Sequence, residues 1–217
     1  MSDIIHAIGT MRLVPVIVIN EEENAYPLAQ ALKAGGLPCA EITFRTAAAE
    51  RSIRAMAADP EILLGAGTVL RPEQVDRAVE AGARYIVTPG FSAEVVRACQ
   101  ASSVPVFPGV STATELQMAL EAGVEVVKFF PAEALGGLTL IKALASPFSM
   151  MRFIPTGGIS LSQLADYLAF PPVLAVGGSW IAPSALIAAK RFEEITELAS
   201  QSVAICQAAP ASKEAGQ

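Results

Sequence analysis

The feature that most constrains the fold is a regular alternation of short apolar segments with helical segments along the whole chain. Between the apolar segments lie helical periodicities, as over residues 72–81 and 114–122, and several of them end in a glycine that suits a left-handed helix C-cap. The pattern predicts eight strands, at residues 14–19, 39–44, 63–68, 85–90, 104–109, 126–131, 152–157 and 173–179. Nearly apolar strands that alternate with helices are typical of a parallel sheet covered by helices.

Eight such units predict a single (β/α)8 TIM barrel, here with a short N-terminal helix in front of it. An open doubly wound sheet is the alternative. That fold usually has fewer strands and often a Gly-x-Gly-x-x-Gly turn after the first strand, where this chain has Asn20 followed by three glutamates. No linker divides the chain. We therefore expect one barrel domain over residues 1–207 and a flexible tail of small and polar residues over 208–217.

Composition and charge limit the kinds of molecule that the protein is expected to bind. The 217 residues are 53% hydrophobic, carry a net charge of −6 and contain no basic stretch, so we expect neither a nucleic-acid nor an anionic-membrane partner. No uninterrupted apolar stretch reaches the roughly 18 residues that span a bilayer, and the N-terminus does not resemble a signal peptide. We expect a cytoplasmic protein that binds a small molecule.

The cysteines and the single histidine exclude several kinds of site. The three cysteines are far apart and form no Cys-x-x-Cys pair, which argues against a disulfide framework or a zinc site. His6 is the only histidine, and it lies in the predicted N-terminal helix as a surface or packing residue. A Ser-His-Asp triad, a multi-histidine metal site and a histidine acid–base pair are therefore excluded.

One lysine is out of place. Lys128 lies in the middle of the apolar run 125–131, where burial disfavours the charged ammonium and favours a neutral, nucleophilic amine. The period of two in strand 39–44 puts Glu41, Thr43 and Arg45 on one face, which we expect to point into the barrel because the apolar face is needed against the helices. The same period turns Lys128 inward, so an acid and an amine converge. The alternative is a buried ion pair without catalytic function.

Polar residues and glycines gather at the strand ends, where barrels of this kind place their active sites. Gly-Gly pairs at 157–158 and 177–178 end the seventh and eighth strands, and loops at these positions frequently bind phosphate. Thr68 and Thr156 offer hydroxyl groups for a substrate carboxylate, or cap the helices that follow. Arg45 holds a carboxylate, tunes Lys128 or pairs with Glu41.

Five motifs together resemble one family: Ala-Glu-Ile-Thr-Phe-Arg-Thr (40–46), Gly-Ala-Gly-Thr-Val (65–69), Val-Lys-Phe-Phe-Pro-Ala-Glu (127–133), Pro-Thr-Gly-Gly-Ile (155–159) and Gly-Gly-Ser-Trp (177–180). The chain is similar over nearly its whole length to the aldolases of 2-keto-3-deoxy-6-phosphogluconate (KDPG) and 4-hydroxy-2-oxoglutarate (KHG), class I aldolases of the Entner-Doudoroff pathway. The resemblance implies a homotrimer of (β/α)8 barrels that needs no metal and no other cofactor.

The resemblance also implies a role for each site residue. Lys128 would form the Schiff base, and Glu41 would be the acid–base residue. Arg45, Thr68 and Thr156 would hold the pyruvate-derived carboxylate or order the lysine. The remaining implied contacts are a phosphate cradle of Gly157, Gly158, Gly178 and Ser179, and a pyruvate wall of Pro89 and Phe130.

The expected reaction is cleavage of KDPG, a phosphorylated 2-keto acid, to pyruvate and glyceraldehyde 3-phosphate, together with cleavage of KHG to pyruvate and glyoxylate. The galactonate epimer of KDPG is an alternative substrate, although its aldolases usually differ in the segment 43–46. Two other classes stay open from the residues alone: a sugar-phosphate isomerase or epimerase without a covalent intermediate, and a non-catalytic binding protein. The single histidine disfavours a metal-dependent aldolase.

Overall fold

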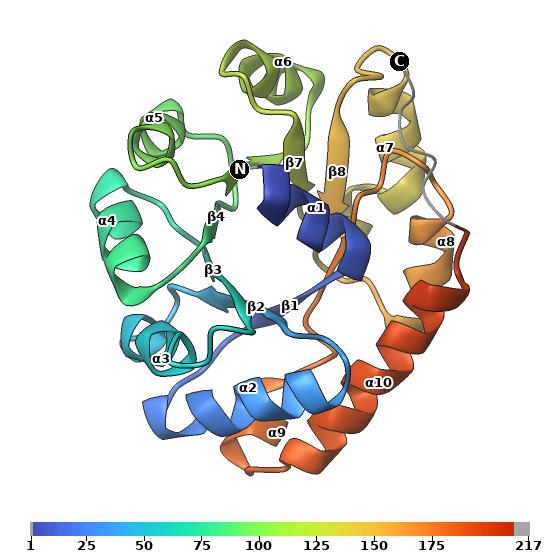
Figure 1. Cartoon of the computed structure of the whole chain (residues 1–217). Coiled ribbons are helices and arrows are strands. Elements are labelled where there is room, and N and C mark those ends of the chain that lie inside the picture. The colour runs from blue at the N-terminus through green and yellow to red at the C-terminus, as the bar shows by residue number, and fades with distance from the viewer. Residues whose placement is uncertain (1, 211–217) are drawn as a thin grey trace.

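In the computed structural model, which describes residues 2–210, the strands surround a central axis and the helices form an outer ring (Figure 1). The strands are β1 (Leu13–Ile17), β2 (Cys39–Thr43), β3 (Leu63–Gly67), β4 (Tyr85–Val87), β5 (Val106–Phe107), β6 (Gly109–Val110), β7 (Val126–Phe129), β8 (Arg152–Pro155) and β9 (Val176–Gly178). The helices are α1 (Ser2–Met11), α2 (Ala25–Ala34), α3 (Ala49–Met56), α4 (Pro72–Ala81), α5 (Ala93–Ala101), α6 (Ala113–Glu121), α7 (Gly137–Ala145), α8 (Leu164–Leu168), α9 (Ser184–Ala188) and α10 (Phe192–Ala208). Three short 3-10 helices are η1 (Glu22–Asn24), η2 (Glu133–Leu135) and η3 (Leu161–Gln163).

All strand pairs are parallel, and the sheet closes on itself. Six strands pair in the order β5-β4-β3-β2-β1-β9, and a second group pairs as β6-β7-β8. The two groups are continuous through β5 and β6 on one side, and parallel bridges Phe153↔Val173 and Thr156↔Gly177 join them on the other. The predicted (β/α)8 barrel is confirmed. The alternative prediction of an open doubly wound sheet is wrong, because the first strand, β1, pairs with the last, β9.

The fifth predicted strand, 104–109, forms two short strands instead of one. Pro108 separates β5 from β6, and a proline has no N–H group for the strand ladder. Its carbonyl still accepts a hydrogen bond from the Lys128 N–H, at 2.9 Å. The interruption therefore lies next to the strand that carries the unusual lysine.

The core has two parts that follow the alternation of side chains along the strands. One part lies between the strands and the helices and includes Ile42 from β2 and Val127 from β7. The other fills the barrel interior, with Val14, Tyr85 and Phe107 among its members. Strands β1 to β5, β7 and β8 thus contribute residues to both parts, as the period of two requires.

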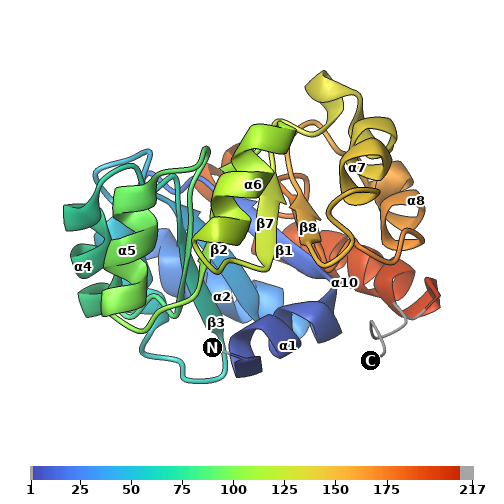
Figure 2. The same cartoon turned by 90° about the horizontal axis from the view of Figure 1, so that it is seen from above.

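Helix α1 closes the end of the barrel where the strands begin. Ile8 is fully buried against the inner part of the core, which includes Leu63 and Val126, the first residues of β3 and β7. Figure 2 shows α1 lying across this end of the strands. The predicted N-terminal helix is confirmed, and His6 is exposed on its surface. The site must therefore open at the opposite end of the barrel.

At the other end of the chain, α10 continues through Ala208, and the Ala209 carbonyl accepts a hydrogen bond of 3.0 Å from Arg12. Residues 211–217, most of the expected tail, lie outside the described residues. In the described part of the chain, no helix combines the length and the apolar character that a membrane span needs. The three cysteines are all free.

Candidate active site

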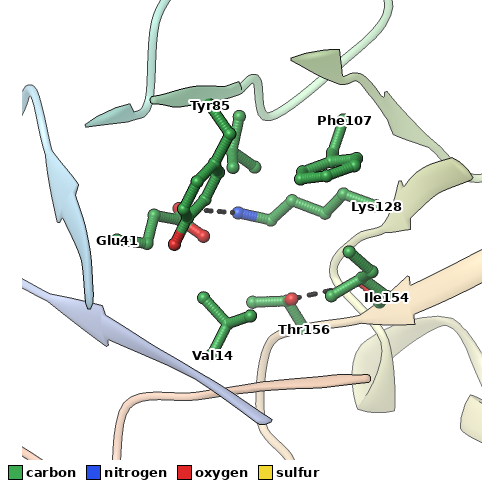
Figure 3. Close-up of a pocket in the computed structure, with 8 residues that line it drawn as sticks. Val14, Glu41, Tyr85, Phe107, Lys128, Ile154 and Thr156 are labelled. Carbon is green, nitrogen blue, oxygen red and sulfur yellow. Dashed lines mark hydrogen bonds and ion pairs between the residues drawn. The ribbon is translucent and has the colours of Figure 1, made fainter. Parts of the chain in front are cut away.

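Lys128 and Glu41 meet inside the barrel. Lys128 extends from β7 and Glu41 from β2, and the lysine Nζ donates a hydrogen bond of 3.4 Å to Glu41 Oε1. The two residues are only 6% and 3% exposed. Figure 3 shows the lysine side chain reaching across the pocket to the carboxylate. The predicted convergence of an acid and an amine is confirmed. The two residues are 87 positions apart in the sequence.

Alternation along the two strands turns these side chains inward. Ala40 and Ile42, which flank Glu41, pack in the outer part of the core, as do Val127 and Phe129, which flank Lys128. The apolar neighbours are needed against the helices, so the charged residue between them points into the barrel. The polar face of β2 continues with Thr43, which is buried and donates to the Ile17 carbonyl at 2.8 Å.

Two inward glycines make room for the site. A side chain at Gly67 on β3 would place its Cβ 2.1 Å from Glu41 Oε1, and one at Gly177 on β9 would place it 2.1 Å from Thr156 Oγ1. Both distances are far below van der Waals contact, so any larger residue would displace the polar group. Gly67 in the motif 65–69 and Gly177 in the motif 177–180 are therefore glycines because a side chain there would collide with Glu41 or Thr156.

The pocket around the pair is narrow and mostly apolar. Its lining residues are Val14, Glu41, Tyr85, Val87, Phe107, Lys128, Ile154 and Thr156 (Figure 3). Burial raises the pKa of Tyr85 well above its usual range, and the neighbouring Cys39 and the charge of Glu41 raise it further. The Tyr85 phenol therefore stays protonated. Glu41 and Lys128 are the acid and the amine among the lining residues.

No metal-binding cluster accompanies this pair. Across residues 2–210, no three or more His, Cys, Asp or Glu side chains lie close enough together to hold a metal ion. Cys39, the buried thiol on β2 nearest the pair in sequence, lies 3.5 Å from the Tyr85 hydroxyl. Burial raises the pKa of this thiol to about 12. Cys39 is therefore neutral and does not compete with Lys128 as a nucleophile.

Two of the predicted substrate-contacting residues lie close to the lysine. The Phe130 ring centroid is 5.2 Å from Lys128 Nζ, within the range of a cation–π contact. Thr156 lines the same pocket and is 5% exposed, with its hydroxyl donating weakly to the Ile154 carbonyl at 3.4 Å. Phe130 and Thr156 thus lie where a group bound to the lysine would be. Pro89 is half-buried at the end of β4.

Thr68 and Thr156 do not cap the helices that follow them, so the capping alternative is wrong for both. The N-cap of α4 is Arg71, and the residue that caps η3 is Ser160. Thr68 has a left-handed backbone with φ of 56°. The other non-glycine residues of this kind within the described chain directly follow helices or their caps, whereas Thr68 follows a strand.

A left-handed β-branched residue is uncommon and costs of order 1–3 kcal/mol. At Thr68 the surrounding structure holds this conformation at the end of β3, directly after Gly67 and beside the pocket. Such backbone strain tends to occur at functional sites. The half-buried Thr68 side chain therefore remains a candidate for substrate contact.

Arg45 is exposed and forms no ion pair with Glu41. The alternative in which Arg45 pairs with Glu41 is wrong, because the partner of Glu41 is Lys128. Arg45 lies two residues beyond the end of β2, on the rim of the barrel. Its guanidinium donates no hydrogen bond to any of the described residues, so it is free to bind an anion that enters from solvent.

The two Gly-Gly pairs lie on neighbouring strand ends. The bridge Thr156↔Gly177 pairs the residue before Gly157 with the residue before Gly178. Gly157 and Gly158 have φ of 103° and 80°, a conformation that favours glycine. Gly158 and Ile159 make no hydrogen bond within the described residues, which leaves their N–H groups available. Ser179 is exposed at the same rim.

Sequence reasoning did not single out several lining residues. Tyr85, Phe107 and Ile154 occupy inward positions on β4, β5 and β8, and the period of two along those strands is the signal that identifies them. It also left Glu133 without a role. That glutamate belongs to the motif 127–133.

Comparison with known proteins agrees with this geometry. The family model "KDPG and KHG aldolase" matches residues 4–198. A 2-dehydro-3-deoxy-phosphogluconate aldolase from Treponema pallidum is 48% identical over 94% of this chain and 98% of its own length. The KDPG aldolase of Legionella pneumophila, solved with pyruvate captured at low pH as a covalent carbinolamine intermediate, is 41% identical with a TM-score of 0.88, over 91% of this chain and 96% of the other.

The KDPG aldolase of Zymomonas mobilis, solved with 3-phosphoglycerate, is 39% identical with a TM-score of 0.86 and covers 93% of this chain and 95% of its own. The likeness thus extends over nearly the full length of each protein in both sequence and fold. The chain is an aldolase, a lyase, and it belongs to the KDPG and KHG aldolase family.

Proposed function

We propose that this aldolase cleaves KDPG to pyruvate and glyceraldehyde 3-phosphate, and KHG to pyruvate and glyoxylate, through a Schiff base on Lys128. The observation that carries the proposal is the buried contact of 3.4 Å between Lys128 Nζ and Glu41 Oε1. The carbinolamine of pyruvate in the Legionella relative supports an amine nucleophile. The names of the relatives support the choice of KDPG.

The pair supplies both the nucleophile and the acid for imine formation. Transfer of a proton from Lys128 Nζ to Glu41 leaves a neutral amine, which attacks the C2 ketone of the substrate. The carbinolamine then loses its hydroxyl group as water, and Glu41 returns the proton that this departure requires. The product is a protonated imine joined to Lys128.

Cleavage uses the imine as an electron sink. The Glu41 carboxylate, directly or through one water, takes the proton of the C4 hydroxyl group, and the electrons of the C3–C4 bond move to the imine nitrogen. Glyceraldehyde 3-phosphate leaves, and an enamine remains on Lys128. Glu41 then protonates the enamine carbon, and water hydrolyses the new imine to release pyruvate.

The remaining residues recognise the two ends of the substrate. Thr68, Thr156 and Arg45 hold the carboxylate, and Phe130 and Pro89 wall the pyruvate end. The phosphate binds the N–H groups and hydroxyl of Gly157, Gly158, Gly178 and Ser179. Paired glycines suit this task because backbone N–H groups can approach an anion closely where no Cβ intervenes. We also propose that the protein is a homotrimer and works in the cytoplasm in the Entner-Doudoroff pathway, which sedimentation and fractionation would test.

Borohydride reduction in the presence of pyruvate tests the covalent step. We expect one carboxyethyl group to be added to Lys128, located by peptide mass mapping, and no addition to Lys33, Lys142 or Lys190. Lys128→Ala should show neither trapping nor cleavage. Cleavage of KDPG by a protein that borohydride and pyruvate leave unmodified would reject the imine route and favour a reaction without a covalent intermediate. Rates on KDPG and on its galactonate epimer decide between the two substrates.

A further inference from the structure

Glu133 is a half-buried carboxylate that the proposed reaction does not use. It lies in η2, a few residues after Lys128, at the end of the motif 127–133. Its backbone N–H donates to the Gly157 carbonyl at 3.0 Å. A side chain at Gly158 would place its Cβ 2.9 Å from the Cβ of Glu133, so the glutamate packs directly against that glycine. Glu133 therefore contacts both residues of the glycine pair 157–158.

The carboxylate is fully engaged on the side of α8 and η3. The Tyr167 hydroxyl donates a short hydrogen bond to Glu133 Oε1, and Gln163 Nε2 donates to Oε2 at 2.7 Å. Gln163 in turn accepts from the Ser160 N–H at 2.9 Å and from its hydroxyl at 2.8 Å. The chain of contacts thus returns to Ser160, two residues beyond Gly158.

These contacts hold the segment 157–160 at both ends while leaving its middle open. Glu133 fixes Gly157 through its backbone, and it fixes Ser160 through Gln163. Gly158 and Ile159 between them make no hydrogen bond within residues 2–210. Both oxygens of the carboxylate accept hydrogen bonds from Tyr167 and Gln163, which are neutral donors, so they do not need a partner in the turn.

We infer that Glu133 is a positioning residue that sets the turn 157–160 in the conformation that binds the substrate phosphate. The inference rests on the proposed function, because it assigns Glu133 to the phosphate end of that site. Glu133 acts through the turn and does not touch the reacting atoms. It should therefore govern binding of phosphorylated substrate and leave imine formation with pyruvate, which has no phosphate, unchanged.

Two variants test this role in the full-length protein. Glu133→Gln keeps the shape of the side chain but replaces one acceptor oxygen with an amide N–H group, which faces the donor Gln163 Nε2 or the Tyr167 hydroxyl. Tyr167→Phe removes a single donor to Glu133. We expect each to raise KM for KDPG about tenfold, the effect of losing one hydrogen bond to a charged group, with kcat within about twofold. The pyruvate concentration that gives half-maximal borohydride trapping should not change.

Glu125→Gln is the matched control, because Glu125 directly precedes β7 at the opposite end of the barrel and is exposed. Thermal unfolding identifies any variant that has lost its fold, and if Glu133→Gln is such a variant, Tyr167→Phe decides. An unchanged KM for KDPG, or an equal loss in KDPG cleavage and in pyruvate trapping, overturns the inference. Failure of the wild-type protein itself to cleave KDPG or to trap pyruvate instead rejects the proposed function.

Discussion

Lys128 Nζ lies 3.4 Å from Glu41 Oε1 in the barrel interior, and within residues 2–210 neither group has another ion-pair partner. Two charges that are buried together depend on each other, because removing one leaves the other without compensation in a poorly solvated place. In the proposed reaction, Glu41 is also the group that takes a proton from Lys128 Nζ. The pair therefore affects both the stability of the fold and the rate of the reaction. Substitutions of Glu41 and of Lys128 should distinguish the two effects.

Glu41→Gln should separate imine formation from turnover. The amide keeps the volume of the side chain and can still contact Lys128, but it cannot carry a proton between the substrate and the enamine. We expect kcat for KDPG cleavage to fall by about 10²- to 10⁴-fold, the usual contribution of a positioned acid–base group. Borohydride should still trap pyruvate on Lys128, but more slowly, because water must replace Glu41 in the proton transfers of imine formation. Steady-state rates and mass mapping measure the two effects. A rate close to that of the wild type would remove Glu41 from its proposed role.

Lys128→Met should abolish activity and also destabilise the fold. Methionine fills a similar volume, but it leaves the Glu41 carboxylate buried without its partner. Breaking a buried pair in this way costs about 3–5 kcal/mol, measurable as a lower free energy of unfolding in urea. Adding Glu41→Gln to this variant should restore much of the loss, since the uncompensated charge is gone. Equal stability of Lys128→Met and the wild type would show that the pair is well solvated.

The sequence predicted the barrel and its central pair because both depend on local periodicity. Strand alternation alone turns Glu41 and Lys128 inward, and the number of βα units sets the closure of the barrel. The predicted helix 72–81 coincides with α4, and Gly82 after it takes the left-handed conformation expected of a C-cap, with φ of 107°.

Features that depend on contacts between distant segments were not predictable in this way. The left-handed backbone of Thr68 and the exposure of Arg45 follow from how the rim of the barrel assembles, which no periodicity encodes. Pro108 was visible in the sequence, but its effect, the division of one strand into two, depends on which ladder it interrupts. Glu133 contacts residues about 30 positions away, and only the folded chain brings them together.

Gly67→Ala should impair catalysis through Glu41. The new methyl group would meet Oε1 at 2.1 Å and the side-chain carbons at 2.7 and 2.8 Å, so the carboxylate must move away from Lys128. Overpacking of this kind costs about 1–3 kcal/mol of stability, and we expect kcat to fall more than the affinity for pyruvate. Gly90→Ala is the control, because no atom lies within 4 Å of where its Cβ would be. Normal turnover in Gly67→Ala would show that Glu41 tolerates displacement.

The thiols should stay unreactive until strongly alkaline pH. Burial raises the pKa of Cys99 to about 12 and that of Cys206 to about 11, against an ordinary value of 9.0, with the charge of Arg12 opposing the rise at Cys206. A raised thiol pKa stabilises the fold fully below pH 9, and this contribution disappears as the pH rises through the folded-state value. We expect a thiol reagent to label the native protein negligibly at pH 8 and to label all three cysteines in urea.

As the pH is raised toward 11, Cys206 should react before Cys99. The Cys206→Ala variant should lose less stability than the wild type over the same pH range. Rapid labelling of native Cys206 at pH 8 would contradict the burial on which this order depends.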